Sequence, residues 1–161
     1  MTIDGFFTPE AAVAISRSVK GLSFKEYEFG KQIDDFNLVS EELDELFSSV
    51  LNFKVTLDQT SGFFRIPYHF IHFEPVESLQ DWLFVVALEQ STFNVFEHKS
   101  GAKTALDGHQ FAYRNLFDWD LKVNYILDPG QGVFFRPWLF HSFDHGLIQV
   151  YKLKESDKKE P

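Results

Sequence analysis

Apolar residues recur at helical spacing near the start of the chain. Thr8-Pro9-Glu10 is typical of a helix start, with a hydroxyl at the N-cap, a proline in the first turn and an acid near the positive end of the helix dipole. Gly21 is a suitable C-terminal residue for this helix. The apolar residues of the stretch are three, four and three positions apart: Ala12, Ile15, Val19 and Leu22.

A second helix is predicted to begin at Ser40. Glu41 and Glu42 fall in its first turn, where acids are favoured, and its charged side chains are expected to form a solvated face. The other face is apolar and contains Leu43, Phe47, Val50 and Leu51.

From about residue 53 onward, the pattern changes to short aromatic and β-branched runs. These runs predict strands near residues 53–57, 63–74, 82–90, 92–98, 121–127, 132–136 and 147–153. Turn residues separate the late strands at Asp128-Pro129-Gly130-Gln131-Gly132 and at Asp144-His145-Gly146. The stretch 99–118 has no clear period and is predicted to be a loop with a helical turn. The pattern indicates a mainly β protein, an antiparallel barrel or jelly roll with N-terminal supporting helices.

The length of 161 residues is most economically explained by a single domain. Residues 1–52 would form the helical support, residues 53–153 the β-barrel and residues 154–161 a charged, frayed tail. Hydrophobic residues make up 44% of the sequence, which is enough for a sizeable core, and the 20 phenylalanines favour strands.

Composition excludes several classes of protein. The chain has no cysteine, so disulfides and thiolate metal sites are excluded. It begins without the basic-then-apolar pattern of a signal peptide and has no apolar run of 18 residues, so we expect a cytoplasmic protein with no membrane segment. The net charge of −9 and the lack of a basic stripe argue against binding to nucleic-acid phosphates.

The stretch FRIPYHFIHFEP, residues 64–75, ends with two candidate metal ligands. On a strand, His72 and Glu74 point to the same side, whereas His69 points to the opposite side. An imidazole nitrogen and a carboxylate oxygen two residues apart can both reach one divalent ion. From this spacing alone, the segment is either part of a metal site or a strand that ends in polar residues, because HxE pairs are common in strands.

A third ligand for such a site is His141, which lies in the stretch GQGVFFRPWLFHSF. In a jelly roll a late strand lies beside an early one, so His141 can converge with His72 and Glu74. Two histidines and one carboxylate on one face of an ion leave three positions open, as in non-haem Fe(II) oxygenases. His98 and His109 have no spaced partner, and we predict structural or solvated roles for them.

Five segments, taken in order, form a more specific pattern than any one of them alone: IDGFFTPEAAVAI, FRIPYHFIHFEP, DWLFVVAL, FNVFEHKSG and GVFFRPWLFHSF. Together they resemble the 2-oxoglutarate/Fe(II)-dependent oxygenase superfamily, and in particular its small, prolyl-hydroxylase-like members. The second segment resembles the strand that carries the family's HxD/E pair, and the last resembles the segment that delivers the distal histidine. The resemblance runs through nearly all of the chain.

The resemblance implies a double-stranded β-helix, Fe(II) held by His72, Glu74 and His141, and 2-oxoglutarate as the cosubstrate. The reaction it implies is oxidative decarboxylation of 2-oxoglutarate coupled to hydroxylation of a small-molecule or peptide substrate, with the difficult chemistry supplied by the cofactor. The sequence departs from the family in having Glu74 where aspartate is usual.

A second departure concerns the anchor for the far carboxylate of 2-oxoglutarate. The family commonly has an arginine or lysine nine to eleven residues after the distal histidine, and no arginine stands there in DHGLIQVYKL. By strand side, His145 and Gln149 are expected to be better placed than Lys152, which would need a bulge to turn inward. Arg136 lies just before His141 and is a further candidate, as are two cations from neighbouring strands, Arg65 and Lys99.

Two other functions fit the same barrel. A cupin-like metal protein would usually have an HxH pair, a following glutamate and set glycines, which HFE does not match well. A noncatalytic interaction module that has lost its chemistry would explain the missing anchor arginine. The substrate and the oligomeric state are not predicted by the sequence.

Overall fold

The computed structural model describes residues 2–20, 25–27, 30–33, 40–58, 62–65, 71–74 and 78–156. The helices are α1 (Pro9–Lys20), α2 (Glu41–Leu51) and the short 3-10 helix η1 (Leu116–Asp118). The strands are β1 (Thr2–Ile3), β2 (Lys25–Tyr27), β3 (Gly30–Ile33), β4 (Val55–Leu57), β5 (Gly62–Arg65), β6 (Asp81–Ala87), β7 (Ser91–His98), β8 (Trp119–Leu127), β9 (Gly132–Phe135), β10 (Phe140–Asp144) and β11 (Leu147–Glu155).

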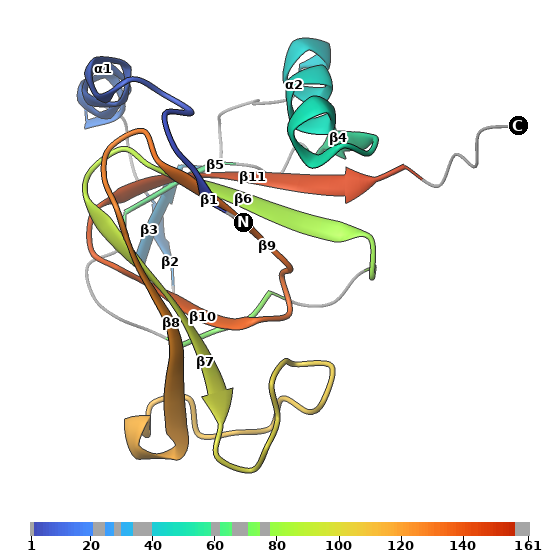
Figure 1. The fold of residues 1–161 in the computed structure, drawn as a ribbon. Helices are drawn as coiled ribbons and strands as arrows, with labels where there is room; N and C mark the ends of the chain where they lie inside the picture. Colours follow the sequence, from blue (N-terminus) through green and yellow to red (C-terminus); the bar gives the residue numbers. More distant parts are fainter. Residues whose placement is uncertain are drawn as a thin grey trace, which may run out of the picture.

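These strands form two sheets that enclose a common core (Figure 1). The large sheet has the order β1-β9-β6-β11-β5-β3-β2, with β4 paired to β11, and the small sheet has the order β10-β7-β8. All strand pairings in the described parts of the chain are antiparallel. Residues 71–74 extend the small sheet, because His72 pairs with His141 of β10.

The chain alternates between the two sheets from β5 onward. It passes from β5 in the large sheet to residues 71–74 beside the small sheet, returns through β6, crosses to β7 and β8, and then alternates through β9, β10 and β11. This winding is that of a double-stranded β-helix, and the predicted jelly-roll fold is confirmed.

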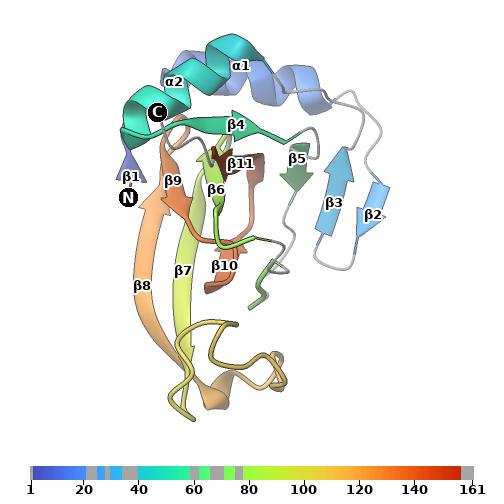
Figure 2. The ribbon, with the colours of Figure 1, turned by 90° about the vertical axis from the view of Figure 1, so that its right-hand side faces the viewer.

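The two N-terminal helices cover the outer face of the large sheet (Figures 1 and 2). Helix α1 begins where the sequence predicts, and the Thr8 hydroxyl accepts a hydrogen bond from the Ala11 amide at 3.1 Å. Helix α2 has the predicted cap as well, since Ser40 accepts from Leu43. We call the outer face under these helices the helix side of the large sheet.

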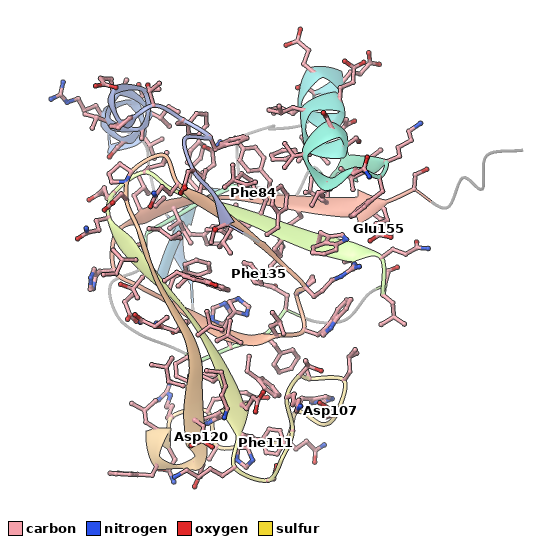
Figure 3. The ribbon with its side chains drawn as sticks, viewed as in Figure 1. Phe84, Asp107, Phe111, Asp120, Phe135 and Glu155 are labelled. Atoms are coloured by element: carbon pink, nitrogen blue, oxygen red, sulfur yellow. The ribbon has the colours of Figure 1, made fainter. Side chains whose placement is uncertain are left out.

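Strand β6 shows why the large sheet needs helices on one face and a second sheet on the other. Its alternate residues Leu83 and Val85 pack into the core between the sheets, with Phe93 and Phe143 of the small sheet. Phe84 points the other way and packs on Phe47 of α2, with ring centroids 5.2 Å apart (Figure 3). A strand buried on both faces is a nearly continuous apolar run, as DWLFVVA is.

Several elements differ from those that the sequence pattern predicts. The strand predicted over 63–74 is present as β5 and the bridge at His72, and its residues 66–70, including His69, lie outside the described residues. Strand β10 was not among the predicted strands, and a turn at 136–139 separates it from β9 and leads it into the other sheet. The short strands β2 and β3 have no apolar alternation and were not predicted.

None of the helices in the described ranges is long and apolar enough to cross a membrane.

The contact between α2 and the large sheet can be tested with Phe47→Ala. Phe47 is fully buried, so its removal is expected to lower the free energy of unfolding by about 3–5 kcal/mol. Leu46→Ala is the matched control, because Leu46 is 44% exposed, and it is expected to change stability by at most about 0.5 kcal/mol. Urea denaturation followed by circular dichroism measures both, and equal losses would contradict this packing.

Candidate metal centre

The structure brings His72 and His141 together through the backbone. The His72 amide donates to the His141 carbonyl at 2.8 Å, and the His141 amide donates to the His72 carbonyl at 2.9 Å. Residues that exchange both hydrogen bonds lie directly opposite each other, with their side chains on the same face. Accordingly, the two imidazole rings lie 4.3 Å apart between centroids.

The alternation predicted for this segment is present. Ile71 and Phe73 pack on one side with Trp119 and Phe140, in a cluster beneath the loop 99–118. His72 points to the other side, as does His141, whose neighbours lie in the core between the sheets.

His141 lies in an apolar, aromatic environment. It is 1% exposed, and its ring contacts Phe135 edge-on, with centroids 4.7 Å apart. Figure 3 shows Phe135 between the two sheets. Phe143 and Phe93 lie farther from the ring, at 6.0 and 6.3 Å.

The protonation of His141 follows from its surroundings. Burial, and then the neighbouring His72, lower the pKa of His141 well below its usual value, against the smaller opposing effect of a hydrogen bond to Leu139. The imidazole is therefore neutral near pH 7. Its Nδ1 lies 2.7 Å from the Leu139 carbonyl, which can only accept, so Nδ1 carries the proton and Nε2 keeps a free lone pair.

Glu74 is near the pair but does not complete it. Its amide donates to the Pro137 carbonyl at 2.8 Å, which fixes the backbone beside the segment that leads to His141, and its side chain is half-buried. Across the described ranges, no three His, Cys, Asp or Glu side chains are grouped closely enough to hold an ion. The structure thus assembles two of the three predicted ligands.

Arg136, a further candidate for the carboxylate anchor, does not turn toward the core. Its guanidinium carbon lies 3.7 Å from the centroid of the Trp82 ring, and its Nη2 pairs with the Glu155 carboxylate at 2.9 Å. Its Nη1 donates to two backbone carbonyls, those of Leu79 and Asp81. Because Trp82 packs on the helix side, this arrangement holds the cation away from the histidines.

The expectation that His145 and Gln149 are better placed than Lys152 is wrong. His145 is exposed in the turn after β10, with a left-handed φ of 39°. Gln149 pairs with Val86, whose side chain lies on the helix side, and the Gln149 side chain hydrogen-bonds Tyr151 in the same layer. Gln149 is 5% exposed, and its Oε1 has no hydrogen-bond partner in the structure.

Lys152 lies on the face of β11 that points into the core. It pairs directly with Leu83, and Leu83 pairs with Phe135, so the three residues form one row across the large sheet. Two strand spacings, about 10 Å, separate the ends of this row, and Phe135 contacts His141. No bulge is needed. Strand β11 is apolar on both faces, with Ile148 and Val150 inward and Tyr151 and Leu153 on the helix side, so its sequence alone does not identify the inward face.

The remaining candidates lie away from the histidine pair or outside the description. His98 ends β7 and stacks on Phe111, with ring centroids 4.0 Å apart, and His109 lies in the loop that follows β7. Lys99 is exposed in the turn beside His98. The side chain of Arg65 lies outside the described residues.

By sequence, no protein-family model and no curated protein matches the chain. The solved structures that resemble its fold include HygX, SnoN and AviO1. HygX from Streptomyces hygroscopicus, solved with nickel and 2-oxoglutarate bound, has a TM-score of 0.62 at 10% identity, over 98% of this chain and 83% of HygX. SnoN, a non-haem α-ketoglutarate-dependent epimerase from nogalamycin biosynthesis, has a TM-score of 0.64 at 12% identity, over 96% of this chain and 78% of SnoN. AviO1 from Streptomyces viridochromogenes Tue57 has a TM-score of 0.56 at 13% identity, over 95% of this chain and 85% of AviO1.

At 10 to 13% identity, these similarities concern the fold. The chain has the same double-stranded β-helix fold as HygX, SnoN and AviO1.

Proposed function

We propose that the protein is an Fe(II)- and 2-oxoglutarate-dependent oxygenase that hydroxylates a small-molecule or peptide substrate. The observation that carries this proposal is the His72–His141 pair, joined by two backbone hydrogen bonds and directed into the barrel. The fold shared with HygX, which binds nickel and 2-oxoglutarate, supports it.

The chemistry of the donor set suits a divalent metal of this kind. His141 is a neutral imidazole with its Nδ1 proton held by a carbonyl, the arrangement that orients a histidine to bind metal through Nε2. His72 supplies the second nitrogen. By strand alternation, Glu74 would share the side of His72, and its long side chain would supply the carboxylate. When bound, Fe(II) would supply the activation of O₂ that these side chains cannot provide.

Lys152 is our proposed partner for the far carboxylate of 2-oxoglutarate. A carboxylate inside a barrel needs a cation or several donors to offset its loss of hydration. Lys152 is half-buried on the inward face of β11, eleven residues after His141. A lysine pairs as a point charge, without the two-pronged geometry of arginine.

The aromatic residues around His141 would keep water from the reacting centre. Phe93, Phe135 and Phe143 pack against one another and against the His141 ring, so this side of the site is apolar. An apolar wall strengthens the electrostatic interactions of the bound groups and limits side reactions.

We propose the cytoplasm as the location of the protein, because the chain has no cysteine.

A second candidate function is that of a noncatalytic interaction module, which would have the same barrel fold without the oxygenase chemistry. The observation that favours it is the position of Glu74, since the described residues include no three-ligand group. Such a protein would bind no metal at His72 and His141, which makes metal binding the measurement that separates the two functions.

Metal binding is expected to depend on the two histidines. His72→Ala should lower the affinity for Ni(II), a stable substitute for Fe(II), by more than about 100-fold, because loss of an outer partner alone costs 10- to 100-fold. His141→Gln should do the same. Isothermal titration calorimetry measures both, with His98→Ala as the control that keeps full affinity. Unchanged nickel affinity in His72→Ala would contradict a metal site at His72 and His141.

Binding of 2-oxoglutarate is expected to depend on Lys152. In nickel-loaded protein, Lys152→Met should weaken 2-oxoglutarate binding by about 10- to 100-fold, the effect of losing one hydrogen bond to a charged group. Lys152→Arg should retain most of the affinity, and Lys154→Met, an exposed lysine on the same strand, is the control. An equal loss in Lys154→Met, or no loss in Lys152→Met, would place the anchor elsewhere.

A further inference from the structure

The turn at residues 136–139 joins β9 of the large sheet to β10 of the small sheet. It is closed by a hydrogen bond from the Leu139 amide to the Arg136 carbonyl, at 3.1 Å. Its second residue is Pro137, and proline is favoured at this position of type I and type II turns. Because the chain changes sheet here, the orientation of the turn decides how the chain enters β10, which carries His141.

Two carbonyl groups of this turn hold the segments that carry predicted metal ligands. The Pro137 carbonyl accepts a hydrogen bond from the Glu74 amide at 2.8 Å. The Leu139 carbonyl lies 2.7 Å from Nδ1 of His141 and accepts its proton. A rotation of the turn would therefore move the backbone partner of Glu74 and the ring partner of His141 together.

The side chain of Arg136 connects this turn to two strands of the large sheet. Its Nη2 pairs with the carboxylate of Glu155 at 2.9 Å, at the end of β11 (Glu155 is labelled in Figure 3). Its Nη1 donates to the carbonyls of Leu79 and Asp81, both at 3.2 Å, where β6 begins. A guanidinium group is planar and presents its donors in fixed directions, so these partners fix the side chain more closely than one ion pair would.

Aromatic contacts hold the same guanidinium group. Its central carbon lies 3.7 Å from the centroid of the Trp82 ring and 5.5 Å from that of Trp138. Trp82 is held in turn, because its Nε1 donates to the Glu155 carboxylate that Arg136 pairs with, at 2.5 Å. An isolated ion pair at a surface contributes little to stability, whereas this pair is part of a hydrogen-bonded and stacked network. We call Arg136, Trp82 and Glu155 the arginine clamp.

We propose that Arg136 is a positioning residue for the metal centre and acts through the turn 136–139 on His141 and Glu74. The arginine clamp ties the turn to β6 and β11, and the carbonyls of the turn then orient the His141 ring and the Glu74 backbone. This inference rests on the proposed oxygenase function as far as the metal is concerned, whereas the orientation of His141 does not require a metal.

The first test is Arg136→Gln, which removes the charge and most donors of the clamp. In metal-free protein, NMR spectra of the imidazole nitrogens report which nitrogen of His141 carries the proton. The wild type is expected to show the proton on Nδ1, and Arg136→Gln a mixture of the Nδ1 and Nε2 forms, because the Leu139 carbonyl is no longer held in place. A pure Nδ1 form in Arg136→Gln, or an Nε2 form in the wild type, would overturn the proposal.

Matched variants separate positioning from a general loss of stability. Lys122→Gln removes another partly exposed ion pair, that of Lys122 with Glu97 on β7, and should leave the His141 ring in the Nδ1 form. Glu155→Gln weakens the clamp from its other side and should act like Arg136→Gln. Arg136→Lys keeps the cation and should lie closer to the wild type than Arg136→Gln does. An equal effect in Lys122→Gln would contradict the proposal.

Nickel binding by the same variants separates this proposal from the oxygenase proposal. Arg136→Gln should lower the affinity for Ni(II) about 10-fold, the lower end of the effect of losing an outer partner of a metal ligand. Wild-type nickel affinity in Arg136→Gln would overturn the role of Arg136 in metal binding and leave the oxygenase proposal intact. A wild type that binds no nickel, with the His141 proton still displaced in Arg136→Gln, would overturn the oxygenase proposal and retain the positioning of His141.

Discussion

The two backbone hydrogen bonds between His72 and His141 are the constraint on which the proposed site depends. They join an early segment to a late strand, 69 positions apart in the sequence, and they place both imidazoles on one face. A shift of one residue in this pairing would send one ring into the cluster beneath the loop 99–118 and replace it with an apolar side chain. The hydrogen bond from His141 to Leu139 then sets which ring nitrogen is available.

The two faces of the large sheet have different roles, one in stability and the other in the candidate site. The helix side is filled by aromatic residues of β6, β9 and β11 against α2, and it also holds Gln149 and Arg136. The inward face carries the row Lys152, Leu83 and Phe135, which leads toward His141. Each strand in this region therefore contributes to stability through one set of side chains and to the candidate site through the alternate set.

Local patterns in the sequence were sufficient for part of this arrangement. The helix caps at Thr8 and Ser40 and the same-side placement of His72 and His141 follow from hydroxyl spacing, strand period and the jelly-roll topology. The sequence pattern assigned His145 and Gln149, rather than Lys152, to the side facing the far carboxylate of 2-oxoglutarate, and this assignment failed for a physical reason. Which side chains of β11 point inward is set by the turn at His145 and Gly146, both at positive φ, and by the pairing with β6, some 65 residues earlier. The sequence of the strand itself carries no direct information about either. The stacking of Arg136 on Trp82 is another long-range contact of this kind.

A crystal structure of the protein with nickel and 2-oxoglutarate tests the metal centre most directly. We expect one nickel ion bonded to Nε2 of His72 and Nε2 of His141, at about 2 Å from each, with the Glu74 carboxylate turned to the same ion. The far carboxylate of 2-oxoglutarate is expected to lie against the Lys152 ammonium. Nickel bound elsewhere, with the His72 and His141 rings still in contact and no ion between them, would contradict the metal centre and favour the noncatalytic barrel.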